Sequence, residues 1–274
     1  MQARLSFYWR FLATGLSMLG FGLCGLFFSI VLFPFIWLWP FRRSQRRVVT
    51  AVVNGFFKSL VAMLQVLGVM ELEVQGLSKL RQVRTAIVVA NHPTYLDVMV
   101  LLALMPVACC VVKGAHWSNP CFWGIVRAAR YVSNADPSEL IDAGARSLDA
   151  GYPMIVFPEG TRSPSQDALH PFSRGFAHMA LKGGNPMVPV LIDCDPPAFT
   201  KEQRWYHVPE RAFRIRVVVL DPVHADDWTD TGMAPTLAAR TITYLMQTHI
   251  TRHLIEYGFF KVGNKTVAGP GVGP

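Results

Sequence analysis

The strongest constraint on this chain is its apolar beginning, because no charged residue occurs from Phe11 to Phe41. A helix needs about 20 predominantly apolar residues to cross a bilayer, so this run is long enough to cross one. It is too long for a signal peptide and lacks the cleavage pattern of one. Pro34 and Pro40 predict a break near its end. We therefore expect either a single membrane span or a re-entrant or interfacial hairpin with the segment that follows.

Arginines flank this uncharged run unequally. Two precede it and four follow it, namely Arg4 and Arg10 on one side and Arg42, Arg43, Arg46 and Arg47 on the other. Because positive charge favours the cytoplasmic side, the heavier cluster predicts that the rest of the chain lies on the cytoplasmic face of the inner, or cytoplasmic, membrane. The four arginines are also expected to strengthen attachment to anionic lipid.

The next segment, from Val48 to Met70, is apolar but contains Asn54, Lys58 and Gln65. Such a segment is typical of a helix that lies along the membrane surface. An ordinary core helix of a globular domain would show the same pattern, so both interpretations stay open. In either case, residues 1–70 are expected to form N-terminal membrane-anchoring helices.

From Glu71 onward, short apolar runs alternate with helical patterns. Strands are predicted at 71–74, 86–90, 109–112, 154–157, 188–192 and 213–220, and helices at 98–105, 137–149, 175–182 and 233–257. This alternation predicts an α/β domain at residues 71–262, with a mixed sheet flanked by helices. The remaining residues, 263–274, are rich in Gly and Pro and are expected to form a flexible tail.

Charge and cysteine content narrow the range of partners. The formal net charge of +8 and the pI of about 9.5 favour anionic partners, such as phospholipid surfaces and phosphorylated substrates. No zinc-finger spacing or RNA-binding signature occurs, so nucleic acid is not an expected partner. The five cysteines include no C-x-x-C pair, which is typical of a reduced cytosolic domain. His249 and His253 have i, i+4 spacing, but we expect a surface pair and no metal site.

A polar motif, Asn91-His92-Pro93-Thr94-Tyr95-Leu96-Asp97, links the predicted strand 86–90 to the helix after it. His92 would therefore leave the end of a strand, where α/β sheets usually bind ligands. Histidine is suited to proton transfer near neutral pH, and a nearby carboxylate can fix its tautomer. A simpler alternative is that Thr94 and Asp97 form a capping box, in which Asp97 only caps its own helix.

A second polar motif, Phe157-Pro158-Glu159-Gly160-Thr161-Arg162-Ser163, also follows a predicted strand. Gly160 lets the backbone turn tightly, and Arg162 offers a planar fork of donors that suits a phosphate. Taken alone, this motif could equally be a polar turn in which Glu159 and Arg162 are solvated.

Together, N-H-x4-D and F-P-E-G-T-R-S resemble the glycerolipid acyltransferase family, typified by bacterial lysophosphatidic acid acyltransferases. Shorter matches keep the order of the family's blocks and extend the resemblance over roughly Thr85 to Ile192. They are Lys113, which opens the second block, Phe172-Ser173-Arg174-Gly175, which resembles F-x-[KR]-G, and Val188-Pro189-Val190, which resembles V-P-V. The apolar N-terminal segment also resembles the family's membrane anchor.

The resemblance implies an acyl-transfer mechanism and a set of residues for it. His92 would act as general base on an acceptor hydroxyl, oriented by Asp97. The activated oxygen would attack an acyl thioester, with acyl-CoA or acyl carrier protein as co-substrate and no cofactor or metal. The implied acceptor is a lysophospholipid such as lysophosphatidic acid, whose phosphate would contact Lys113 and Arg162. The implied substrate-binding residues are Lys113, Glu159, Gly160, Thr161, Arg162 and Arg174.

One stretch departs from the family's pattern G-x-x-[FL]-[IV]-x-R, whose arginine contributes to phosphate binding. Here Ala128 stands for the glycine and Asn134 for the arginine. Either Arg127 or Arg130 replaces the lost charge, or the acceptor is not a simple phosphate monoester. Three hypotheses follow: acyl transfer to lysophosphatidic acid, acyl transfer to another lipid such as a lyso-aminolipid or a specialised acyl product, and membrane lipid binding without turnover. The intact motifs argue against the third.

Overall fold

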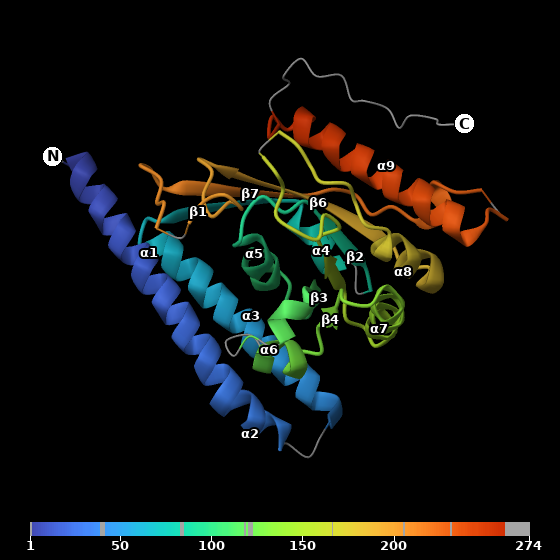
Figure 1. Cartoon of the computed structure of the whole chain (residues 1–274), viewed down its shortest axis with the longest axis horizontal. Coiled ribbons are helices and arrows are strands. Elements are labelled where there is room, and N and C mark those ends of the chain that lie inside the picture. The colour runs from blue at the N-terminus through green and yellow to red at the C-terminus, as the bar shows by residue number, and fades with distance from the viewer. Residues whose placement is uncertain are drawn as a thin grey trace.

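The computed structural model of the protein describes residues 2–38, 42–82, 85–117, 119, 123–165, 167–204, 206–230 and 232–260. The predicted tail at 263–274 lies outside the described residues, as do Pro40 and the side chains of Arg4, Arg42 and Arg43. Two long helical segments lie beside an α/β domain (Figure 1). This arrangement confirms the predicted fold class.

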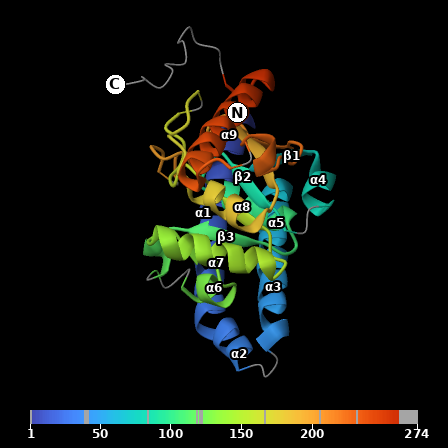
Figure 2. The same cartoon turned by 90° about the vertical axis from the view of Figure 1, so that its right-hand side faces the viewer.

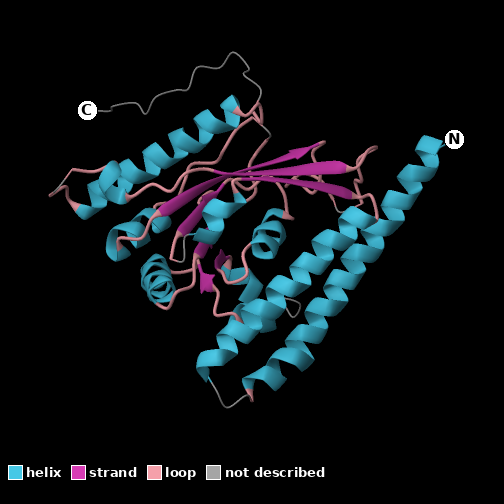
Figure 3. Cartoon of the chain, turned by 180° about the vertical axis from the view of Figure 1, so that it is seen from behind, coloured by secondary structure: helices cyan, strands magenta, loops and turns pink. Residues whose placement is uncertain are grey.

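The apolar beginning of the chain pairs with the next helix to form a hairpin. Its elements are α1 (Gln2–Phe27), the short π-helix η1 (Phe28–Leu32), α2 (Phe33–Trp37) and α3 (Arg42–Val66). Figures 1 and 3 show α1 and α3 side by side, running in opposite directions. The rings of Phe21 and Phe28 contact the Phe56 ring, with centroids 6.1 and 5.1 Å apart. The two segments therefore form a helical hairpin, and how it lies in a membrane stays a prediction.

A seven-stranded mixed sheet forms the centre of the α/β domain, in the order β1-β7-β6-β2-β5-β3-β4. Strands β6, β2, β5, β3 and β4 run parallel, whereas β7 is antiparallel to β6 and β1 is parallel to β7. The bounds are β1 (Met70–Gln75), β2 (Ile87–Ala90), β3 (Cys109–Val112), β4 (Val132–Ser133), β5 (Met154–Val156), β6 (Met187–Asp195) and β7 (Phe213–Val219). Strand β4 was not predicted, because two residues are too few to show a pattern.

Helices cover both faces of this sheet (Figures 1 and 2). Helix α8 packs against α7 and against α9 on one face, and α5 packs against α3 on the other. Asp136 caps α7 by accepting hydrogen bonds from the amides of Ser138 and Glu139, which explains the predicted start of this helix. The bounds are α4 (Leu77–Gln82), α5 (Asp97–Leu104), η2 (Gly114–Trp117), α6 (Trp123–Ala128), α7 (Pro137–Asp149), α8 (Gly175–Gly183), η3 (Ala225–Asp227) and α9 (Pro235–Glu256).

Strand β2 is the central strand, with β5 on one side and β6 on the other. All four of its residues are buried, which matches a run of apolar residues without alternation. The chain first continues to β3 on the β5 side and only later returns to β6. The carboxyl end of β2 is therefore a topological switch point, where open α/β sheets usually bind ligands. His92 lies just beyond this end.

Arg46 anchors α3 to the α/β domain, so the prediction that it strengthens attachment to anionic lipid is wrong. Its Nε donates to the carbonyl of Ala129 at 3.2 Å, and its Nη2 donates to Ser147 Oγ at 2.7 Å. The guanidinium also lies over the Tyr152 ring, 3.7 Å from its centre. A buried charge requires partners of this kind. Arg47, by contrast, is exposed.

Candidate active site

His92 and Asp97 form a hydrogen-bonded pair at the carboxyl end of β2. The distance from His92 Nδ1 to Asp97 Oδ2 is 2.8 Å, and the Asp97 side chain is completely buried. Because the carboxylate accepts the proton on Nδ1, Nε2 is the ring atom that can take up a proton. The His92 side chain keeps 16% of its surface exposed, so a small reacting group can reach it.

Thr94 holds the carboxylate of Asp97 from the other side. Its amide donates to Oδ2 at 2.7 Å, and its hydroxyl donates to Oδ1 at 2.6 Å. The capping-box alternative therefore accounts for only one of these contacts, because the Thr94 hydroxyl bonds the carboxylate and accepts from the amide of Leu96. Asp97 begins α5, and its carboxylate also contacts His92. The contact with His92 is the one that suits proton transfer.

Phe157, the residue after β5, stacks on the imidazole. The two ring centroids are 4.3 Å apart and the planes are inclined by 30°. Together with the bond to Asp97, this contact restricts the rotation of the His92 ring. No role was predicted for Phe157 from the sequence, although its place as an aromatic residue at the start of a polar motif, beside a strand end, was a signal for one.

Glu159 joins the two motifs through its carboxylate. Oε1 accepts from the amide of His92 at 3.0 Å and from Ser163 Oγ at 2.7 Å, and Oε2 accepts from the amide of His170 at 2.9 Å. The Ser163 amide in turn donates to the His92 carbonyl at 2.8 Å. Burial raises the pKa of the Glu159 carboxyl. Its described partners are thus protein groups that fix the backbone around His92.

Arg162 is half-buried and points to a loop beyond the family motifs. Its Nη1 donates to the carbonyls of Phe199 and Thr200 at 2.9 and 2.8 Å. Gly160 precedes it with φ of +64°, a conformation that favours glycine and allows the turn. Thr161 is also half-buried. The structure therefore brings Glu159 to His92 and the Arg162 guanidinium to the loop after β6, where part of its donor capacity goes to main-chain carbonyls.

The two remaining predicted binding residues, Lys113 and Arg174, lie after β3 and at the start of α8. Lys113 is exposed just after β3, which β5 separates from β2, whereas the Arg162 guanidinium reaches the loop after β6. Arg162 itself follows β5, on the same side of β2 as Lys113, and only its guanidinium extends to the other side of β2. Arg174 is exposed at the start of α8, and its neighbour Ser173 donates from its amide to the Pro158 carbonyl at 2.8 Å. Their predicted contacts with substrate stay predictions.

The stretch that departs from the family's pattern lies at the β3–β4 edge. Asn134 is exposed beyond β4, and its Oδ1 accepts from the amide of Gly114 at 3.3 Å. Arg130 does not replace the missing arginine, because its carbonyl accepts from Cys109 Sγ at the amino end of β3, the opposite edge from the site. The Arg127 guanidinium stacks over Trp123, 5.0 Å from the centre of that ring.

Possible metal ligands do not gather in the described part of the chain, where no group of three or more His, Cys, Asp or Glu side chains could hold a metal ion. The rings of His249 and His253 lie 4.3 Å apart on α9, and His253 Nδ1 contacts the His249 carbonyl at 2.9 Å. Burial lowers the pKa of His249 below its ordinary value, with a further contribution from the charge of His253.

A histidine–carboxylate pair at the switch point of a mixed α/β sheet defines a protein equipped to remove a proton from a hydroxyl group. Residues 71–193 match the model of the acyltransferase family, described as Acyltransferase. Over these residues the chain is similar to the acyltransferase family, which agrees with the resemblance that the two motifs show.

Curated relatives have a common name. The chain is 29% identical over 166 residues to the 1-acyl-sn-glycerol-3-phosphate acyltransferase of Limnanthes alba, covering 58% of this chain and 56% of that protein. It is 27% identical over 229 residues to the protein of the same name from Cocos nucifera, covering 81% and 68%. For the alpha form from Mus musculus, the identity is 27% over 164 residues, covering 57% and 56%. The chain thus spans little more than half the length of two of these relatives.

A solved structure shares the fold. The crystal structure of the 1-acyl-sn-glycerophosphate (LPA) acyltransferase PlsC from Thermotoga maritima matches with a TM-score of 0.67. The match covers 91% of this chain and 98% of that chain at 22% identity. At this identity, the likeness establishes the fold.

Proposed function

We propose that the protein is a membrane-bound O-acyltransferase that moves a fatty acyl group from an acyl thioester to the hydroxyl of a lysophospholipid, with lysophosphatidic acid as acceptor. The observation that carries this proposal is the 2.8 Å contact between His92 Nδ1 and Asp97 Oδ2 at the end of β2, in a domain similar to the acyltransferase family. The names of the curated relatives support the choice of acceptor. Acyl-CoA or acyl carrier protein would supply the thioester as co-substrate, without a cofactor.

In the proposed reaction, His92 Nε2 removes the proton from the acceptor hydroxyl while the oxygen attacks the thioester carbonyl. Asp97 stabilises the imidazolium that forms, because its buried carboxylate faces Nδ1. The tetrahedral intermediate collapses, the carbon–sulfur bond breaks, and the imidazolium returns its proton to the leaving thiolate. The products are the acylated lipid and a free thiol. General-base assistance of this kind typically contributes about 10²–10⁴-fold to the rate.

A second candidate function is the same transfer to a different lipid acceptor, such as a lyso-aminolipid or a specialised acyl product. The observation that favours it is Asn134, which replaces the family's arginine without a substitute from Arg130. Lipid binding without turnover explains less, because it gives no reason for a completely buried carboxylate aimed at a reachable histidine.

Attachment to a membrane is supported by the outer face of the hairpin. By length and composition, the segments Ser6–Ile36 and Gln45–Val66 could both cross a membrane, and only 17% of an apolar 18-residue window in the first is buried. A continuous stripe of exposed apolar side chains follows α1, η1 and α2, formed by Tyr8, Trp9, Phe11, Leu12, Leu16, Leu19, Leu23, Phe27, Ile30, Val31, Phe35 and Leu38. An exposed apolar surface of this size marks an interaction with lipid or protein.

The hairpin is held to the α/β domain at both ends, which favours attachment along the membrane over a bilayer crossing. At one end, the Arg10 guanidinium donates to the carbonyl of Glu210. At the other, Arg46 donates to Ser147 Oγ. A crossing of the hydrocarbon core, about 30 Å thick, would carry one end away from a domain that stays on one side. We therefore propose an interfacial or re-entrant hairpin, with the α/β domain on the cytoplasmic side of the inner membrane.

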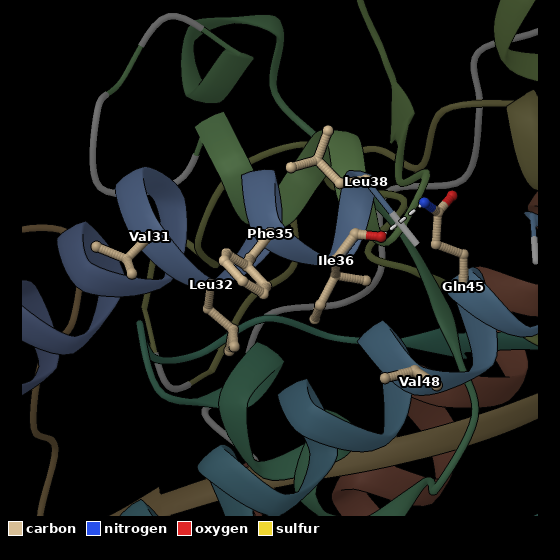
Figure 4. Close-up of a pocket in the computed structure, with 7 residues that line it drawn as sticks. All are labelled: Val31, Leu32, Phe35, Ile36, Leu38, Gln45 and Val48. Carbon is tan, nitrogen blue, oxygen red and sulfur yellow. Dashed lines mark hydrogen bonds between the residues drawn. The ribbon is translucent and has the colours of Figure 1, made fainter. Parts of the chain in front are cut away.

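A cavity of about 460 Å³ at the closed end of the hairpin fits the same interpretation. Figure 4 shows its lining between α2 and α3, formed by Val31, Leu32, Phe35, Ile36, Leu38, Gln45 and Val48. Gln45, the one polar side chain of this lining, donates from Nε2 to the Ile36 carbonyl at 2.7 Å. A lipid tail suits the remaining apolar surface.

The proposed function is tested by thiol release from acyl-CoA and from acyl carrier protein, each with a panel of lyso-lipids. We expect turnover with lysophosphatidic acid by the wild type and none by His92→Ala, with the circular dichroism spectrum of the variant unchanged. Turnover by purified His92→Ala near the wild-type rate would overturn the mechanism. Activity only on lipids without a phosphate monoester would select the second candidate function. Release of the wild type into the soluble pool without detergent would contradict membrane attachment.

A further inference from the structure

The loop after β6 lies against both motifs, although it is outside the segment that matches the acyltransferase family. The match ends at residue 193, and the loop comprises Pro196–Gln203. Its residue Phe199 accepts through its carbonyl from the Tyr95 amide at 3.1 Å and from Arg162 Nη1 at 2.9 Å. One carbonyl thus joins the histidine motif, the arginine motif and this loop.

The conformation of the loop is fixed from within by Gln203. Its Nε2 donates to the carbonyl of Pro197 at 3.2 Å, and its Oε1 accepts from the Thr200 amide at 3.4 Å. The Gln203 amide also donates to the Thr200 carbonyl at 3.3 Å. The side chain therefore closes the loop around Phe199 and presents two adjacent carbonyls to the arginine.

Phe199 itself adopts a conformation that a phenylalanine rarely uses. Its φ is +54°, in the left-handed region, and its ring packs edge-on against Phe213 with centroids 5.8 Å apart. Residues are held in this region only where the surroundings determine the backbone strongly. The left-handed turn directs the Phe199 carbonyl to Tyr95 and Arg162, which is where both described bonds to that carbonyl come from.

Two hydrogen bonds to the loop fix the guanidinium of Arg162 through a single nitrogen. Both go through Nη1, to Phe199 and Thr200. Because the guanidinium is planar, fixing one nitrogen in two directions restricts the orientation of Nε and Nη2 as well. An arginine restricted in this way loses less rotamer freedom when it binds an anion, and its donors meet the anion in a fixed direction.

We propose that Pro196–Gln203 is the acceptor-orienting element of the active site, and that Gln203 is a positioning residue that acts through Arg162. The loop aims the guanidinium at the anionic group of the lysophospholipid, so it determines where the acceptor hydroxyl lies relative to His92. This proposal rests on the proposed function. Since the loop lies beyond the shared motifs, its sequence can change acceptor preference without altering His92 or Asp97.

The test is the substitution Gln203→Ala in two backgrounds. In the wild type, it removes both side-chain bonds that close the loop, so we expect KM for the lysophospholipid to rise by about 3- to 10-fold. We expect KM for the thioester to stay within about twofold, because binding of the thioester does not depend on the aim of Arg162. In an Arg162→Ala background, the same substitution should change KM for the acceptor by less than about twofold, since residues that act together are not additive.

Asn185→Ala is the matched control. The Asn185 side-chain amide also donates a hydrogen bond to a loop carbonyl, that of Thr85 at 3.1 Å. This bond lies at the amino ends of β2 and β6, away from the site at the carboxyl end of β2. It should lower the melting temperature without changing KM for either substrate. An equal rise in acceptor KM in Asn185→Ala would show that loss of stability alone is responsible. An equal effect of Gln203→Ala with and without Arg162, or a parallel rise in thioester KM, would also overturn the proposal.

A second measurement does not depend on turnover. The Tyr95 amide donates to the Phe199 carbonyl and the Thr200 amide donates to Gln203, so both should exchange hydrogen faster in Gln203→Ala than in the wild type. The Tyr95 amide should also exchange faster in Arg162→Ala. Unchanged exchange in both variants would overturn the inference even if the enzyme is active. If the two variants exchange faster than the wild type as expected, but the wild type transfers no acyl group, the proposed function would be overturned and this inference would not.

Discussion

The main-chain amide of His92 donates to Glu159 Oε1 at 3.0 Å, so the second motif supports the backbone of the first. Glu159 was predicted to bind substrate, yet its carboxylate is buried and accepts from protein donors of three residues, His92, Ser163 and His170. In this chain, the motif's glutamate orients the loop that bears the histidine. The two motifs are therefore parts of one hydrogen-bonded unit.

Asp97→Asn should reduce kcat by at least about 10²-fold, with KM for both substrates little changed. An asparagine oxygen can still accept from His92 Nδ1, but it lacks the charge that stabilises the imidazolium. The measurement is steady-state kinetics with saturating thioester, alongside the melting temperature of the variant. A kcat within about threefold of the wild type would show that Asp97 only begins α5.

Thr94→Val should lower both kcat and stability. The hydroxyl donates to Asp97 Oδ1 at 2.6 Å and accepts from the Leu96 amide, and valine removes both bonds at nearly constant volume. A hydrogen bond to a buried charged group contributes about 1.5–3 kcal/mol, so we expect a loss of this order in the free energy of unfolding. Thr94→Ser keeps the hydroxyl and should behave like the wild type. Equal losses in the serine and valine variants would assign the effect to packing of the methyl group.

The pKa of Glu159 makes the stability of the protein depend on pH. Because burial raises this pKa in the folded state, the folded chain binds more protons than the unfolded chain just above the ordinary range of glutamate. The free energy of unfolding contributed by this group therefore falls as pH rises through the folded pKa. Glu159→Gln does not titrate and places an amide opposite the His170 amide, so it should be less stable than the wild type at low pH.

The measurement is the difference in denaturation midpoint between the wild type and Glu159→Gln, followed upward from pH 4.5. We expect this difference to become smaller as pH rises. A difference that grows with pH would mean that the three protein donors outweigh burial and favour the ionised carboxyl, which would reverse the direction of the shift.

Arg46 and Arg47 should respond oppositely to the same substitution. Arg46→Gln removes a buried guanidinium bonded to Ser147 and Ala129, so the free energy of unfolding should fall by about 2 kcal/mol. Arg47→Gln removes an exposed charge and should change stability by less than about 0.5 kcal/mol. Binding of Arg47→Gln to anionic vesicles should weaken by at most about 1 kcal/mol. Vesicle binding that weakens only in Arg46→Gln would return Arg46 to a role in lipid attachment.

The contrast between these neighbours shows what the sequence could and could not predict. Apolar periodicity predicted the main strands and the helices α5, α7, α8 and α9, because these patterns are local. The role of Arg46 depends on residues about a hundred positions later, such as Ser147. A cluster of arginines after an apolar run looks the same in the sequence whether its members bond to the protein or face lipid. Phe199 carries no local signal either, since its contact with Arg162 depends on the order of β2, β5 and β6.

The site shows the same division. His92 and Asp97 could be predicted, because a short loop between a strand and a helix keeps them close whatever the rest of the fold does. Lys113 and Arg162 were expected to share one phosphate. Lys113 follows β3, whereas the Arg162 guanidinium extends from the end of β5 to the loop after β6, on the other side of β2. Strand order is a property of the whole sheet, so their spacing along the chain contained no information about it.

Asn134→Arg tests the identity of the acceptor. Asn134 is exposed beyond β4, and its described side-chain bond, from the Gly114 amide, is long at 3.3 Å, so an arginine should be accepted without loss of stability. If the acceptor bears a phosphate monoester that reaches the β3–β4 edge beside Lys113, the restored charge faces a dianion. The kcat/KM for lysophosphatidic acid should then stay equal or rise, by up to about tenfold for one added charge-assisted hydrogen bond. For a neutral or zwitterionic acceptor, kcat/KM should stay equal or fall, because the new guanidinium gains no partner and has to be desolvated as the lipid binds.

Comparing wild type and Asn134→Arg on lysophosphatidic acid and on a lyso-aminolipid separates these cases. Turnover of the lyso-aminolipid alone, by both proteins, would overturn lysophosphatidic acid as the acceptor and leave the acyl-transfer chemistry of His92 and Asp97 intact.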